Sequence, residues 1–189
     1  MVKLRYGNTN TFYLSGLLVD TDMPGTLPGL QRELKRHGLS LRDVRYVLCT
    51  HYHPDHMGLV STLNDRGVKL LLAEHQLPHV HFSDAIFSRQ RGLSCPPIDE
   101  SRAEIISCAE SRRFLASLGI PGELVPTYSH SPDGVALVTD EGDAFVGDLE
   151  PEEYADAYDD PAPLRSDWAR VLALRPGTVY FGHYNDRVL

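Results

Sequence analysis

Apolar and polar positions alternate along the chain in short runs, which predicts strands interspersed with helices. Short runs of β-branched and aromatic residues bounded by glycine or polar residues are typical of strands. We expect strands at residues 3–6, 11–15, 17–19, 44–49, 68–72 and 179–181, and several short ones between 123 and 145. Strands mixed with helices in this way fit two packed sheets with helices outside.

Other stretches carry apolar residues at helical spacing. We expect helices at residues 26–37, 57–65, 101–118 and 164–174. The first ends at Gly38 and the third at Gly119, and glycine is the usual residue just past a helix end. The apolar positions that favour the third helix are Ile105, Ile106, Phe114, Leu115 and Leu118.

Composition narrows the class of protein. A chain of 189 residues fits one domain, residues 1–189, and its net charge of −8 argues against a nucleic-acid partner. The first residues lack the apolar core of a signal peptide, and no stretch approaches the ~20 apolar residues of a membrane span. The three cysteines form no disulfide pattern. We expect a cytoplasmic protein without a membrane partner; the sequence sets no oligomeric state.

Potential metal ligands are most closely spaced in residues 51–56, which read His-x-His-x-Asp-His. Three imidazoles and a carboxylate that close together suit a divalent ion, zinc first, with iron or manganese as alternatives. Pro54 argues against a continuous helix through the motif. We therefore expect His51, His53, Asp55 and His56 on a loop just past the strand at 44–49.

Three later residues are candidate ligands for the same metal site. His130 lies in a turn-rich stretch, Asp148 follows the apolar run that ends at Gly147, and His183 follows the run that ends at Gly182. Each is a polar residue at the end of an apolar run. Each could instead be an ordinary turn residue, but their shared placement favours ligands.

In this order the motifs resemble those of the metallo-β-lactamase-fold superfamily: an early acid (Asp20), His-x-His-x-Asp-His, a lone histidine, Gly-Asp and Gly-His. The resemblance implies an α/β fold of the four-layered αββα sandwich type. It also implies two metal sites, one held by His51, His53 and His130 and one by Asp55, His56 and His183, with Asp148 bridging them. Asp20 would support the ligand loop; it could instead be a helix N-cap or turn acid, a role for which Asp22 competes.

Two cations held close together can share a hydroxide, lower its pKa and stabilise an oxyanion. Asp55 is then both a ligand and the candidate to orient the hydroxide or take its proton. The sequence predicts a dinuclear metal-dependent hydrolase that cleaves a small ester, thioester or lactone. The alternatives are a mononuclear iron persulfide dioxygenase and a non-catalytic metal-binding scaffold; seven retained candidate ligands argue against both.

Differences between this sequence and particular members of the superfamily narrow the range of expected substrates. The retained Asp148 argues against β-lactamase activity, and His53 stands where flavodiiron proteins carry glutamate. Only six residues follow His183, so we expect no helical glutathione-binding domain of the glyoxalase II kind. The acidic charge argues against the RNA-processing nucleases of the fold. A small-molecule substrate remains.

Two tyrosines are candidate substrate contacts because each lies close in sequence to a ligand. Tyr128 replaces a more usual Pro-Gly turn before His130, and could instead pack on a sheet; Tyr184 follows His183. The segment 75–100, with His75, His79, His81, Arg89 and Arg91, has no clear element pattern. We expect it to cover the substrate site rather than to bind a third metal.

Overall fold

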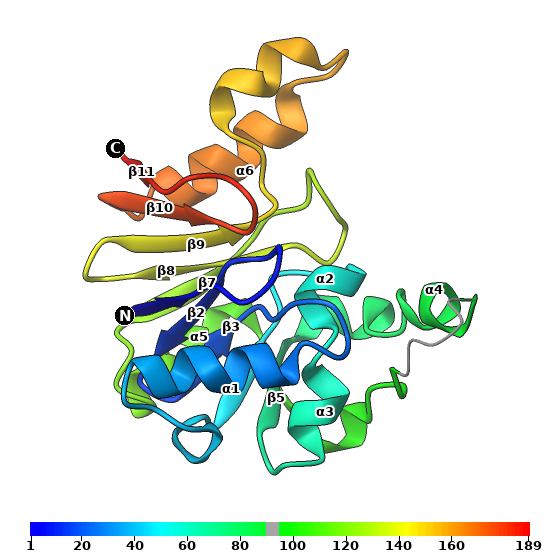
Figure 1. The fold of residues 1–189 in the computed structure, drawn as a ribbon. Coiled ribbons are helices and arrows are strands. Elements are labelled where there is room, and N and C mark those ends of the chain that lie inside the picture. Colours follow the sequence, from blue (N-terminus) through cyan, green and yellow to red (C-terminus); the bar gives the residue numbers. More distant parts are fainter. Residues whose placement is uncertain (90–94) are drawn as a thin grey trace.

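The computed structural model describes residues 1–89 and 95–189, and its strands form two sheets (Figure 1). The six-stranded sheet has the order β1-β2-β3-β4-β5-β6: Val2–Leu4, Thr11–Leu14, Leu17–Val19, Tyr46–Leu48, Lys69–Ala73 and Glu104–Ile106. The five-stranded sheet has the order β11-β10-β9-β8-β7: Arg187–Val188, Thr178–Phe181, Asp143–Gly147, Val135–Thr139 and Gly122–Pro126. β3 to β6 pair in parallel, as do β9 and β10.

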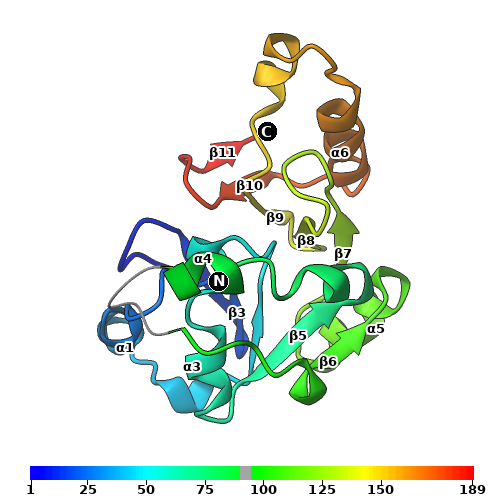
Figure 2. The same cartoon turned by 90° about the vertical axis from the view of Figure 1, so that its right-hand side faces the viewer.

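Helices lie on the outer faces of both sheets, but Leu115 of the helix Cys108–Ser117 packs into the core between the sheets. In chain order, α1 to α6 are Leu27–Arg36, Pro54–Met57, Val60–Asn64, Asp84–Arg89, Cys108–Ser117 and Ala162–Leu172. Short 3₁₀ segments occupy Leu41–Asp43, Glu74–His79, Glu100–Arg102 and Glu152–Ala157. Figure 2 shows α1 and α3 beside the first sheet and α6 beside the second.

Strand residues point alternately into two cores because side chains alternate across a sheet. In β5, Leu70 and Leu72 pack with the α1 and α3 layer, whereas Leu71 faces the core between the sheets. In β8, Leu137 faces that central core and Val138 packs toward α6. Each fully buried side chain of this size contributes roughly 1.5–3 kcal/mol. The structure confirms the four-layered αββα arrangement.

The predicted helix at 101–118 is wrong in its first half. Ile105 pairs with Leu72 as β6 adds to the first sheet, and the helix begins only at Cys108. The hydroxyl of Ser107 accepts the Glu110 amide and caps the helix. Two adjacent β-branched residues suit a strand, and the Ser-x-x-Glu capping pattern was the sequence signal for the later start.

The predicted helix at 57–65 is broken, and the metal motif is only partly a loop. α2 begins at Pro54 and ends at Met57, so Asp55 and His56 lie on a single helical turn. The break follows at Gly58, where an added Cβ would come within 2.5 Å of the Asp22 carbonyl oxygen. Proline fits the first position of a helix, and glycine permits this close approach.

The other predicted helices are confirmed with small shifts of their ends. α1 lies inside the expected 26–37 and is followed by Gly38, whose φ is +73°. α6 begins two residues before the expected 164. In residues 1–89 and 95–189, no helix has both the length and the apolar character that crossing a membrane requires.

Candidate metal centre

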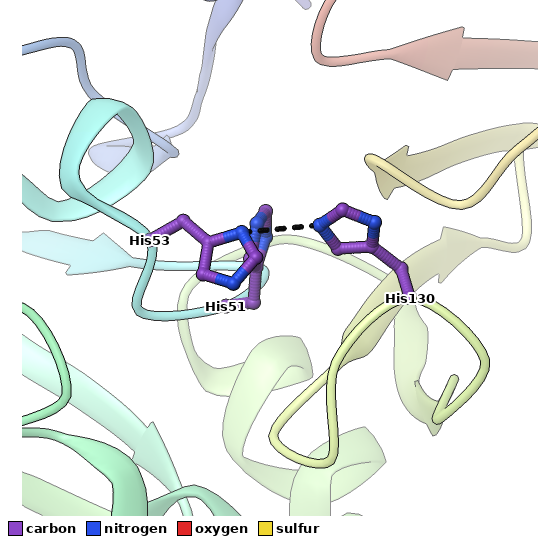
Figure 3. A group of neighbouring side chains, drawn as sticks. All are labelled: His51, His53 and His130. Carbon is purple, nitrogen blue, oxygen red and sulfur yellow. Dashed lines mark hydrogen bonds between the residues drawn. The ribbon is translucent and has the colours of Figure 1, made fainter.

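The candidate ligands meet where strand ends of the two sheets face each other. The segment after β4 carries the 51–56 motif, the turn between β7 and β8 carries His130, and Asp148 and His183 follow β9 and β10. Figure 3 shows His51 and His53 from one loop and His130 from another, with their rings turned toward a common point. Residues distant in sequence are thus brought to one site.

The loop geometry explains why His51 and His53 share a side. Tyr52, between them, points the opposite way and is fully buried in the core of the first sheet. The Tyr52 amide donates to Asp133 at 2.6 Å, and Asp133 belongs to the turn that carries His130. The Val135 amide also donates to the Thr50 carbonyl at 2.8 Å. These bonds fasten the two ligand-bearing segments together.

Two groups of ligand atoms match the predicted sets. One is His51, His53 and His130, and the other is Asp55, His56 and His183; a third group, His51, His56 and Asp148, overlaps both, and within each group the atoms lie within 4.8 Å of one another. Nδ1 of His53 and Nε2 of His130 are 3.1 Å apart (Figure 3). In the second group, Nε2 of His183 lies 3.0 Å from Oδ2 of Asp55.

Asp148 lies between the groups and turns one carboxylate oxygen toward each. Its Oδ1 is 3.2 Å from Nε2 of His56 and 3.5 Å from Nε2 of His183. Its Oδ2 is 3.9 Å from Nε2 of His51 and 3.8 Å from Nε2 of His130. This is the placement that a bridging carboxylate requires.

Nε2 of His51, Nε2 of His56 and Oδ1 of Asp148 are buried here without a well-aligned hydrogen bond, although the last two atoms lie 3.2 Å apart as an ion pair. Leaving such atoms unpaired in a folded protein costs about 1–3 kcal/mol each. A divalent cation would satisfy all three atoms at once, because imidazole nitrogens and carboxylate oxygens are its usual ligands. The residues therefore fit a metal centre.

The outer nitrogens of three histidines are held by oxygen atoms. Nδ1 of His56 lies 2.9 Å from Oδ2 of Asp20, Nδ1 of His51 lies 3.2 Å from Oγ1 of Thr50, and Nδ1 of His183 lies 3.2 Å from the Asn8 carbonyl oxygen. Such contacts fix the ring and aim Nε2 at the centre. The structure thus places Asp20 behind His56, where the sequence predicts a supporting residue. Thr50 and the Asn8 carbonyl were missed, because no motif marks them.

Asp20 and Asp22 accept hydrogen bonds from different parts of the chain. The Asp20 carboxylate also accepts the Thr50 amide at 2.7 Å, and the residue adopts a φ of +58°. Asp22 accepts the Thr9 amide at 3.0 Å and the Met23 amide at 2.6 Å, so it organises a turn. Both acids are buried, but the contact with His56 belongs to Asp20.

Electrostatics favour ionised carboxylates and a neutral His51. Burial and the neighbouring histidines hold the pKa of His51 well below its ordinary value. Burial also acts to lower the pKa of His56, but Asp20 and Asp148 outweigh it and raise the pKa to about 10. The hydrogen bond from His183 lowers the pKa of Asp55. Binding a cation at His56 therefore displaces a proton.

Two glycines make room for the ligands that follow them. A Cβ on Gly147, whose φ is +58°, would lie 2.2 Å from Oγ1 of Thr50. A Cβ on Gly182 would lie 2.6 Å from Oδ1 of Asp148 and 2.7 Å from Cε1 of His56. The glycine before each late ligand is thus a packing requirement of the centre.

The two candidate substrate tyrosines lie in different surroundings near the centre. Tyr128 is 49% exposed; its ring lies edge-on to His75 at 5.5 Å and below the Arg170 guanidinium at 5.7 Å, rather than packing on a sheet. Tyr184 is exposed and packs on Phe181. Substrate contact by either tyrosine stays a prediction.

The segment 75–100 contributes a residue that the sequence did not single out. The exposed Phe82 ring lies 5.3 Å from the His53 ring. His75 binds the Gly134 carbonyl oxygen, and His81 pairs with Asp84 and Glu100. In the part of the chain that the structure describes, none of the segment's histidines joins a group of three potential ligands. Arg91, named from the sequence, lies outside the described residues.

Comparison with known proteins gives the family. The sequence profile of the Metallo-beta-lactamase superfamily matches residues 5–183. The chain belongs to this superfamily.

Two curated relatives are 27% identical to the chain. They are Beta-lactamase-like protein 2 homolog of Drosophila melanogaster (94% of this chain, 59% of the relative) and Hydroxyacylglutathione hydrolase of Vibrio cholerae (87% and 65%). The chain thus spans less than two thirds of the length of either relative.

Solved structures share the fold. TTHA1623, in a di-iron-bound form, matches with a TM-score of 0.70 and 26% identity over 99% of this chain and 93% of that one. The metallo-beta-lactamase family protein TTHA1429 from Thermus thermophilus matches with a TM-score of 0.69 and 20% identity, over 95% and 69%.

Proposed function

We propose that this protein is a dinuclear metal-dependent hydrolase that cleaves a small ester, thioester or lactone. The observation that carries the proposal is the convergence of three buried atoms, on His51, His56 and Asp148, where the ligand groups overlap. Imidazole nitrogens and carboxylate oxygens that converge in this way make a ligand set for a divalent cation.

We assign the candidate residues separate roles in binding metal and in proton transfer. His51, His53 and His130 would hold one ion, Asp55, His56 and His183 the other, and Asp148 both. Bound there, two divalent ions supply a water of lowered pKa and positive charge for a developing oxyanion. Asp55 is fixed by His183 and by the Thr9 hydroxyl at 3.4 Å, and we assign it the proton transfer at the centre.

The intact second ligand group argues for two ions rather than for a mononuclear iron dioxygenase. Zinc suits the nitrogen and oxygen donors, and the di-iron-bound TTHA1623 supports iron as the alternative. Manganese is the third candidate. Metal analysis of protein purified without added metal, by plasma mass spectrometry, distinguishes the three.

The substrate class is inferred from charge and from a relative. The net charge of −8 opposes a polyanionic partner such as RNA. The name of the Vibrio cholerae relative describes hydrolysis of an acylglutathione, which is a thioester. The charge argues against a nucleic-acid partner, and the relative's name supports a small acyl substrate.

A matched panel tests the proposal. Metal-loaded protein is given an ester, a thioester, a lactone and a phosphodiester of similar size, with Asp148→Ala as the inactive control. We expect at least one acyl compound to be cleaved with a kcat/KM far above that for the phosphodiester. Faster phosphodiester cleavage, or equal rates with Asp148→Ala, would overturn it.

A further inference from the structure

A cavity of ≈ 230 Å³ opens beside His130, on the second-sheet side of the centre. Its lining includes Leu164 of α6 and the polar residues Ser129, Glu150, Tyr158 and Asp160. Pockets for a whole ligand are usually about 300–1,000 Å³. This cavity therefore suits one end of a small molecule whose reacting group lies at the metals.

The cavity wall carries two carboxylates, on Glu150 and Asp160. Glu150 and Asp160 take part in no ion pair among residues 1–89 and 95–189. The nearby arginines are engaged elsewhere, since Arg165 pairs with Asp156 and Arg170 with Asp167. A cleft lined by one sign of charge concentrates ligands of the opposite sign.

The two carboxylates are held in place. The Tyr158 hydroxyl donates to the Glu150 carboxylate, and the Trp168 indole N–H donates to the Glu150 carbonyl at 2.8 Å. The Ala162 amide donates to Oδ1 of Asp160 at 3.0 Å, at the start of α6. Fixed charges lose little entropy when a ligand binds.

An unpaired hydroxyl also points to a ligand. Ser129 lines the cavity, and its Oγ is buried without a hydrogen-bond partner. A hydroxyl oxygen can accept a hydrogen bond or lie against a positively charged group. The aromatic ring of Tyr158 adds a surface that attracts a cation.

We infer that this cavity receives a positively charged nitrogen group, so that the substrate is a small cationic ester, thioester or lactone. The inference rests on the proposed function for the reacting end of the substrate. It goes beyond it by assigning the charge of the other end and the residues that select it, Glu150 and Asp160.

Acetylthiocholine and its uncharged isostere, S-(3,3-dimethylbutyl) thioacetate, provide the test. Water cleaves each to acetate and a thiol, which a thiol reagent detects. At low ionic strength, we expect the metal-loaded protein to favour the cationic thioester by roughly tenfold in kcat/KM, as two partly exposed carboxylates allow. An anionic analogue, S-acetyl-3-mercaptopropionate, should be the poorest of the three.

Conservative variants locate the selectivity. Glu150→Gln keeps an acceptor for Tyr158, and Asp160→Asn keeps a cap for α6. Each should lower the cation-to-neutral ratio of kcat/KM by roughly twofold to fivefold. Asp159→Asn removes a charge from the same segment but not from the cavity wall, and should leave the ratio unchanged. Equal ratios in all four proteins would overturn the inference.

Choline binding separates this inference from the proposed function. Choline and 3,3-dimethylbutanol are titrated into the protein while the NMR signals of Tyr158 and Ser129 are followed. Choline-specific shifts that weaken in Glu150→Gln support the cavity even if no acyl compound is cleaved. Hydrolysis without cation preference and without choline shifts would keep the function and reject the cavity.

Discussion

His51 and His56 come from the first sheet and have side chains only 2% and 0% exposed, whereas His130 and His183 come from the second sheet and are 32% and 35% exposed. The buried pair is braced by Thr50 and Asp20. Beside the exposed pair lie tyrosines and the acidic cavity wall. The buried half fixes the ligand geometry, and we expect the exposed half to face the substrate.

Asp148 joins the halves, so its removal should have the largest effect. Asp148→Ala deletes an oxygen from each ligand group and a negative charge between two cations. We expect loss of one ion and at least a ~10³-fold drop in kcat/KM, with the fold retained by circular dichroism. Two bound ions and undiminished activity would show that Asp148 is no bridge.

Substitution of Asp20 tests whether the buried histidines need the oxygen atoms that contact their outer nitrogens. Asp20→Ala leaves Nδ1 of His56 and the Thr50 amide without their partner. Metal affinity should fall by about 10–100-fold, measured by competition with a chromophoric chelator. The matched control is Asp22→Ala, which removes a turn acid and should change metal affinity far less. Similar losses in both variants would count against the brace.

Gly147 tests the packing behind Asp148. Gly147→Ala forces a Cβ against Thr50 at positive φ and should lower the free energy of unfolding by about 2–4 kcal/mol. Gly38→Ala has a similar φ of +73° but open space around it, so it isolates the conformational part, about 1–2 kcal/mol. Denaturant titration of both variants measures the difference. Equal losses would mean that the contact with Thr50 carries no cost.

The smallest effect is expected on the exposed half. Tyr128→Phe should weaken turnover by roughly twofold to tenfold, the worth of about one hydrogen bond, while metal content stays the same. The control is Tyr13→Phe. It removes a hydroxyl that donates to the Asp43 carbonyl and belongs to no ligand-bearing segment. Unchanged kinetics in Tyr128→Phe would remove this tyrosine from the substrate contacts.

The candidate ligands could be predicted from the sequence because each follows an apolar strand and belongs to an ordered motif. Asp20 could be placed behind them for the same reason. Thr50, the Asn8 carbonyl and Phe82 could not, since their roles arise only when separate segments fold together. Ile105 misled the helix prediction because helical spacing and strand pairing compete in a short apolar run, and pairing with Leu72 decided it.

Metal stoichiometry tests the central claim most directly. Protein saturated with zinc or iron and freed of excess metal is analysed by plasma mass spectrometry against its amino-acid content. With two ligand groups joined by Asp148, the protein should bind two ions per chain, falling to one in His56→Ala. A single ion in the metal-saturated wild-type protein, with Asp55, His56 and His183 unliganded, would contradict the dinuclear centre.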